Sequence, residues 1–199
     1  MSADRKGSRW VTAGVVVAGL LAGAASGWFW LQKGMIQGES YAGWSGNSVT
    51  GSADADPWTR ARVAVAGLLA LNKSQAIYFT RNTDSSGARL REDCRYRVSG
   101  GTLPARWWSV TVYAADNYLP INDDQALSFD ATEVQGDAAG NWTATLAPKR
   151  PESGAWASTR KAGEFDITLR LYQPDARAQA DYGSIPMPKV ERLDCGDQA

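Results

Sequence analysis

The chain has 199 residues, of which 44% are hydrophobic, and its 21 basic side chains balance 21 acidic ones. This length and composition suit one globular domain and argue against a disordered chain. Histidine is absent, which excludes Ser-His and Cys-His nucleophiles, His-ligated zinc and the usual general base at neutral pH. We therefore expect no metal and no cofactor.

The first predicted element is a membrane span. Residues 10–32 contain no charged side chain, and as a helix this run would reach about 35 Å, enough to cross a hydrocarbon core of about 30 Å. Arg5, Lys6 and Arg9 precede the run, whereas only Lys33 follows it closely. This bias predicts a single-pass protein of the inner membrane, in contact with lipid, with its N-terminus in the cytoplasm and its domain periplasmic or extracellular.

A cleaved signal peptide is the alternative to an uncleaved anchor. Residues 22–24 read Ala-Gly-Ala, an acceptable cleavage signature after a basic start. However, Trp28 to Leu31 continue the apolar run, and Trp10 with Trp30 places aromatic side chains at both membrane interfaces. We favour the uncleaved anchor.

A stripe of glycines within the span predicts helix pairing. Gly19, Gly23 and Gly27 repeat every fourth residue, and small side chains allow two helix backbones to approach closely in lipid. The spacing therefore predicts a homodimer through the span. The alternative is that glycine is simply abundant here and the stripe faces lipid.

Beyond the span we expect a stalk and then a domain. Residues 33–56 are rich in Gly, Ser, Asn and Ala, which predicts a flexible stalk. Asp56 and Pro57 then resemble a helix cap and first turn, and apolar residues at helical spacing extend the predicted helix to Asn72. The predicted division of the chain is 1–9 cytoplasmic, 10–32 transmembrane, 33–56 stalk and 57–199 domain.

The rest of the domain shows the alternation that is typical of half-buried strands. Apolar and polar residues alternate in several segments separated by turns rich in Gly, Asp, Asn and Ser. These segments predict a mainly β fold, an antiparallel β-sandwich of jelly-roll type with one packed helix. The segments are Ile77–Phe79, Cys94–Val98, Trp108–Ala114, Trp142–Leu146 and Phe165–Leu171.

Several motifs together resemble a known bacterial family. They occur in order between about Pro57 and Cys195, and the family is the one numbered 1214 among domains of unknown function. The resemblance implies a β-sandwich of jelly-roll character that in longer proteins follows a sister domain numbered 1254, whose place the membrane segment takes here. The family has no established reaction, so no catalytic residue carries over. The motifs are Thr59–Ala61, Leu68–Leu71, Ala76–Phe79, Cys94–Val98, Leu103–Ser109, Asp166–Tyr172 and Pro188–Arg192.

The two cysteines, Cys94 and Cys195, both lie on the exported side, where disulfides form. An even count favours a disulfide between them, which would join the first part of the sandwich to its last. Two separately buried thiols remain the alternative.

Two groups of side chains could carry catalysis. Asp116, Asp123 and Asp124 cluster near a strand end, and glycoside chemistry needs only two carboxylates. Asp beside Asn, Pro and Gly is nevertheless ordinary turn chemistry, which we favour. Ser158 and Lys161 match the Ser-x-x-Lys pattern of serine acyl-enzymes, but the predicted fold is wrong for that chemistry.

A binding surface is the stronger candidate. Trp107 and Tyr113 fall on the strand face opposite Trp108, where they could stack on sugar rings or form a protein interface, with Arg106 and Asp116 as polar partners. The alternative is that a second sheet or the predicted helix covers this face.

The functional prediction is therefore a membrane-anchored cell-envelope domain that binds or scaffolds an envelope protein or a glycan. A carboxylate-based enzyme acting on a saccharide is second to it. Four basic residues and one acidic residue lie at or before Lys33. The chain after Lys33 therefore carries 17 basic and 20 acidic side chains, without a long run of like charge. We expect no nucleic-acid partner.

Overall fold

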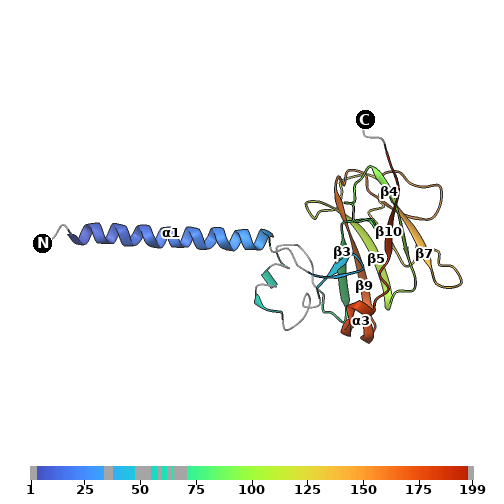
Figure 1. Ribbon diagram of the computed structural model, residues 1–199, viewed down its shortest axis with the longest axis horizontal. Coiled ribbons are helices and arrows are strands. Elements are labelled where there is room, and N and C mark those ends of the chain that lie inside the picture. The colour runs from blue at the N-terminus through green and yellow to red at the C-terminus, as the bar shows by residue number, and fades with distance from the viewer. Residues whose placement is uncertain are drawn as a thin grey trace.

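The computed structural model describes residues 4–33, 38–47, 55–57, 60–61, 64 and 71–196. Its first element is the helix α1 (Asp4–Lys33), which extends away from a β-rich domain (Figure 1). Within α1, the 21 residues Arg9–Phe29 have a mean hydropathy of 1.6, and none of this stretch is buried against the rest of the chain. The helix is thus long and apolar enough to cross a membrane, a property that anchors and export signals share.

The described part of the domain forms two sheets and is mainly β, as predicted. The larger sheet has six strands and the smaller one four. In spatial order the larger sheet contains β1 (Glu39–Tyr41), β2 (Trp44–Gly46), β3 (Ala76–Arg81), β9 (Phe165–Pro174), β5 (Ala105–Ala114) and β6 (Ser128–Asp130). The smaller sheet contains β10 (Lys189–Cys195), β4 (Cys94–Gly100), β7 (Trp142–Ala147) and β8 (Ala155–Ser158).

The two sheets pack face to face because each strand presents its apolar positions to the same side. Trp108 of β5 stacks on Trp142 of β7 with ring centroids 4.4 Å apart. Tyr96 of β4 meets Phe165 of β9 edge to face at 6.0 Å. These contacts join the sheets through a single core, which confirms the predicted sandwich. The jelly-roll detail stays a prediction.

One strand pair departs from the antiparallel prediction. β7 and β8 are parallel, with Ala144 opposite Ala155 and Ala147 opposite Ser158. The reason lies in the connection, because residues 148–154 lead back along the sheet before β8 begins opposite Ala144. Local alternation carries no information about strand direction, so the sequence could not show this.

The predicted helix from Pro57 to Asn72 falls mostly outside the described residues. Where the chain is described, Pro57, Arg60, Ala61 and Ala64 are helical. The backbone N–H of Arg60 donates to the carbonyl oxygen of Asp56 at 3.1 Å, so the helix begins where the sequence predicted.

Two short helical segments at the other end of the domain's sequence were not predicted. α3 (Ala176–Ala180) is capped by Asp175, whose carboxylate accepts from the N–H of Ala178 at 2.8 Å. The 3-10 turn η1 (Tyr182–Ser184) follows it. Both are shorter than the window in which helical periodicity can be recognised. In Figure 1, α3 closes the lower end of the sandwich.

The predicted flexible stalk at 33–56 is wrong for residues 39–46, which form the hairpin β1–β2 on the edge of the larger sheet. Its two turn residues, Ala42 and Gly43, have φ of 51° and 86°, as a tight hairpin requires. Trp44 is fully buried, and Arg81 donates to the carbonyl oxygen of Ala42 at 3.0 Å. Gly- and Ser-rich composition hid the hairpin, although Trp44 and the partly buried Tyr41 anchor it to the core.

The hairpin shortens the tether between helix and domain. Five residues, 34–38, separate the end of α1 from the start of β1. Even fully extended, they allow at most about 22 Å between Lys33 and Glu39. The β-rich domain therefore stays close to the end of α1.

Candidate functional site

The larger sheet has an outer face, turned away from the smaller sheet, that carries two of the predicted ligand-surface residues. On β5 the even-numbered residues from Trp108 to Val112 point into the core, so the odd-numbered ones point outward. Register with β9 and β3 extends this face across three strands. The outer face is defined here as Tyr78 and Thr80 of β3, Asp166, Thr168, Arg170 and Tyr172 of β9, and Trp107, Ser109, Thr111 and Tyr113 of β5.

Arg170 lies at the centre of the outer face, opposite Tyr78 on one neighbouring strand and Ser109 on the other. Its Nη1 donates to Oγ1 of Thr111 at 2.8 Å, and its Nη2 donates to the hydroxyl of Tyr113. The guanidinium carbon is 5.5 Å from the centroid of the Tyr113 ring. Hydroxyl groups and a ring therefore hold this half-buried cation.

No carboxylate compensates the charge of Arg170 within the part of the chain that the structure describes, at the 4.0 Å limit for an ion pair. The acid at the end of the outer face, Asp166, is paired instead with Arg89 at 2.6 Å. Asp130 lies opposite Ser109 on β6, and its carboxylate accepts from the backbone N–H of Thr132 at 2.7 Å.

An aromatic pair lies beside Arg170 on the same face. Trp107 and Tyr172 are cross-strand partners, and their ring centroids are 5.1 Å apart with planes inclined at 48°. Both side chains are half-buried, so part of each ring is exposed to solvent. Burial raises the pKa of Tyr78 on β3, and its hydroxyl therefore stays protonated at neutral pH.

The structure does not bring the other two predicted residues to this face. Arg106 is on the opposite side of β5 from Trp107, and its Nη1 donates to Oε1 of Gln173 at 3.2 Å. Asp116 lies in the turn after β5, where its carboxylate accepts from the N–H of Tyr118 at 3.0 Å. Neighbouring positions in a strand alternate between faces, which is why closeness in sequence misled the prediction.

Among the candidate catalytic carboxylates, Asp124 is occupied by a structural ion pair. It accepts from Nη2 of Arg160 at 2.7 Å and from Oγ of Ser158 at 2.6 Å. The hydrogen bonds from Arg160 and Ser158 lower the pKa of Asp124, whereas a general acid needs a raised one. Ser158 is fully buried and donates to this acid, so the Ser-x-x-Lys pattern does not form an acylation site.

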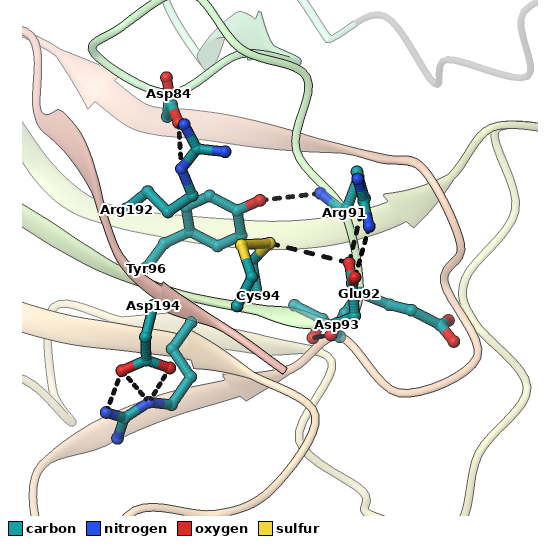
Figure 2. Close-up of a disulfide and its surroundings, with 11 residues drawn as sticks. Asp84, Arg91, Glu92, Asp93, Cys94, Tyr96, Arg192 and Asp194 are labelled. Carbon is teal, nitrogen blue, oxygen red and sulfur yellow. Dashed lines mark hydrogen bonds and ion pairs between the residues drawn. A yellow bond between two sulfur atoms is a disulfide. The ribbon is translucent and has the colours of Figure 1, made fainter. Parts of the chain in front are cut away.

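The predicted disulfide is present between Cys94 and Cys195, which are partners in the pairing of β4 with β10 (Figure 2). The S–S distance is 2.00 Å across a sequence separation of 101 residues. Figure 2 shows polar contacts around the bridge, including the hydroxyl of Tyr96, which accepts from the backbone N–H of Arg91 at 2.9 Å. The bridge therefore joins the first strand of the smaller sheet to the last.

An ion pair of a buried aspartate near the bridge was not predicted. Nε of Arg192 on β10 is 3.3 Å from Oδ2 of Asp84; the aspartate side chain is 1% exposed and that of the arginine 41% (Figure 2). Oδ1 of Asp84 accepts from the hydroxyl of Ser86 at 2.6 Å, from its N–H at 2.8 Å and from the N–H of Ala88 at 3.1 Å. Burial alone would raise the pKa of Asp84, but these hydrogen bonds and Arg192 outweigh it and lower the pKa.

The glycine stripe lies open on α1. A Cβ atom placed at Gly19, Gly23 or Gly27 would meet no atom within 4 Å. Helix pairing through this stripe stays a prediction. Across the described ranges, no three His, Cys, Asp or Glu side chains gather in a way that could hold a metal ion.

Residues 75–176 match the protein family described as "Protein of unknown function (DUF1214)". The chain belongs to this family. The matched segment of this DUF1214 chain contains every residue of the outer face, from Tyr78 to Tyr172. The hairpin β1–β2 and the strand β10 with Cys195 lie outside it.

One solved structure has a similar fold over most of this chain. The crystal structure of the VPA0106 protein from Vibrio parahaemolyticus is similar with a TM-score of 0.58 and 22% identity, over 71% of this chain and 36% of that chain. The present chain thus spans about a third of that protein. An uncharacterised protein from Burkholderia cenocepacia has a TM-score of 0.43 and 17% identity, over 90% of this chain and 52% of that one. No curated protein matches the sequence significantly.

Proposed function

We propose that this DUF1214 chain is a membrane-anchored envelope domain that binds a saccharide on the outer face of its larger sheet. The observation that carries the proposal is the half-buried pair of Trp107 and Tyr172, held on adjacent central strands. Aromatic rings present a flat apolar surface to the C–H face of a sugar ring. Because β5 and β9 pair along their whole length, the platform is rigid before any ligand arrives.

The polar groups of the outer face suit the hydroxyls of the same ligand. Ser109, Thr111 and Thr168 lie between the aromatic side chains but are themselves buried, so the hydroxyls that face a ligand are those of the half-buried Thr80 and Tyr113. Hydroxyl side chains both donate and accept, as sugar hydroxyls do. From Trp107 to Tyr113 the face runs about 20 Å along β5, so it can contact several sugar units.

The location follows from α1. We place α1 as an uncleaved span with its N-terminus in the cytoplasm, because Arg5, Lys6 and Arg9 precede its apolar stretch. The domain then lies on the far side of the inner membrane. The five residues between α1 and β1 keep it near the bilayer.

Binding is favoured over catalysis by the state of the candidate acid. Asp124, with its lowered pKa and its contacts to Arg160 and Ser158, anchors a loop. Two carboxylates lie on this side of the sheet: Arg89 pairs with Asp166, and Asp130 accepts from the backbone N–H of Thr132. Hydrolysis of a glycoside by two carboxylates needs one of them protonated at working pH.

The test is direct binding of soluble oligosaccharides to the full chain in detergent micelles, measured by calorimetry. We expect Trp107→Ala to weaken binding about tenfold or more, since it removes half of the aromatic platform. The matched control is Tyr118→Ala, an aromatic residue that is 74% exposed in the loop after β5. Equal loss in both variants, or no saccharide bound by the unchanged protein, would refute the proposal.

A further inference from the structure

We infer, on the basis of the saccharide binding proposed above, that the ligand is acidic and that Arg170 binds its carboxylate. The ligand class is a uronic acid-containing saccharide. Three features of the outer face support this inference: the unused donors of Arg170, the absence of a compensating acid, and the position of Arg170 beside the aromatic pair.

Arg170 has donors to spare. A guanidinium carries five N–H groups in a rigid fork. The structure gives hydrogen bonds to two acceptors, Oγ1 of Thr111 and the hydroxyl of Tyr113, and both belong to β5. The remaining N–H groups can form the paired, parallel hydrogen bonds that a planar carboxylate accepts.

The charge of Arg170 is uncompensated by the described residues around it. Partial burial removes water from the guanidinium, and its neutral partners Thr111 and Tyr113 do not offset that loss as an anion would. The acids on this side of the sheet are committed elsewhere, Asp166 to Arg89 and Asp130 to the turn at Thr132. A partly desolvated guanidinium without an ion-pair partner favours an anionic ligand.

The position of Arg170 fits a charged group on a saccharide of several units. Its side chain extends away from Trp107 and Tyr172, and its guanidinium is held at Thr111 and Tyr113. With one sugar ring stacked on Trp107 and Tyr172, a following unit along β5 therefore brings its carboxylate to the guanidinium. Thr111 and Tyr113 act as positioning residues, because they hold the guanidinium over β5 before the ligand binds.

The test compares two probes with the same sugar backbone, tetragalacturonate with ionised carboxyl groups and its uncharged methyl ester, on the full chain in detergent micelles. We expect the acid to bind about tenfold or more tightly than the ester, and to weaken as salt is raised. Arg170→Gln should remove this preference and leave the ester unaffected. Trp107→Ala should weaken both probes alike.

Two further variants keep the result interpretable. Arg97→Gln alters an arginine that is 52% exposed on the smaller sheet and should change neither affinity. Arg170→Lys retains the charge without the planar fork, so we expect an intermediate preference for the acid together with an unchanged melting temperature. A stable Arg170→Lys protein with full preference would show that the fork geometry is not used.

The outcomes separate the two proposals. If acid and ester bind equally, or if Arg170→Gln keeps the preference, the inference about charge is wrong while saccharide binding stands. If the unchanged protein binds neither probe nor any neutral oligosaccharide, both proposals fail. Loss of binding in Arg97→Gln as well would show a nonspecific charge effect and would also overturn the role of Arg170.

Discussion

The indole Nε1 of Trp44 donates a hydrogen bond to the carbonyl oxygen of Pro188 at 2.8 Å, across 144 positions of sequence. The side chain is fully buried, and its one polar atom is satisfied by the backbone just before β10. This contact ties the hairpin that follows α1 to the strand β10. Within the segment that composition marked as a stalk, the hairpin β1–β2 is therefore part of the core.

Replacing Trp44 should destabilise the domain strongly. Trp44→Ala removes a buried ring and should lower the free energy of unfolding by about 3–5 kcal/mol. Trp44→Phe keeps most of the volume but leaves the carbonyl of Pro188 without its donor, at a cost of about 1–3 kcal/mol. Urea unfolding of residues 38–199 measures both.

A pair of deletions checks the same point. Removal of residues 1–37 should leave the unfolding midpoint of the domain unchanged, whereas removal of residues 1–47 should lower it. Equal midpoints would mean that the hairpin contributes nothing to the fold.

The disulfide should stabilise the domain considerably. Closing a loop across 101 positions removes at most about 4–5 kcal/mol of unfolded-state entropy on the chain-entropy model. Reduction should lower the melting temperature and slow migration on a gel, and Cys195→Ser should behave as the reduced protein does in both measurements. Labelling of two thiols in the native, unreduced protein would contradict the bridge.

Stability should decline in acid through Asp84. Its pKa is lowered in the folded state from an unfolded value of about 3.9, so its contribution is fully present above about pH 5 and is lost as the pH falls through the folded pKa. Asp84→Asn should reduce the free energy of unfolding at pH 7 by about 1–3 kcal/mol. The difference from the unchanged protein should shrink below about pH 4.

The control for Asp84 is an exposed acid on β10, the strand that carries Arg192. Asp194 pairs with Arg95, but its side chain is 51% exposed, and exposed pairs contribute little because water screens them. Asp194→Asn should therefore leave the pH profile almost unchanged. An equal loss of unfolding free energy in both variants would show that net charge, rather than the pair of Asp84 with Arg192, sets the pH dependence of stability.

Membrane topology is tested with a reporter that is active only outside the cytoplasm. Fused after Ala199, it should be active, because Arg5, Lys6 and Arg9 precede the apolar stretch of α1. Activity from a reporter that works only in the cytoplasm would reverse the proposed orientation.

Pairing of the span is tested by enlarging the centre of the glycine stripe. Gly23→Ile should reduce the signal in a membrane two-hybrid assay, because a bulky side chain keeps the helix backbones apart. Ala25→Ile, which adds a bulky side chain on the side of α1 opposite the stripe, is the control. An unchanged signal from Gly23→Ile would show that the stripe faces lipid.

Half-buried strands could be predicted because their alternation is local. The segments around Phe79, Val98, Val110, Ala144 and Leu169 were all identified, and each lies within a strand of the structure. The short strands β1, β2, β6 and β8 were missed, since three or four residues show too little alternation to distinguish from a loop. Two residues of the candidate surface, Trp107 and Tyr113, were predicted from the sequence. Its central residue, Arg170, was not.

The sequence by itself determined the apolar helix, the β class, the disulfide pair and the family, because each depends on composition or on residues close together in the chain. Tertiary structure alone decided the burial of Trp44 against Pro188, the pairing of Asp84 with Arg192 and the parallel placement of β8. It also placed Arg170 between Tyr78 and Thr111. These relationships join residues that are far apart in sequence, and only the register between strands brings them together.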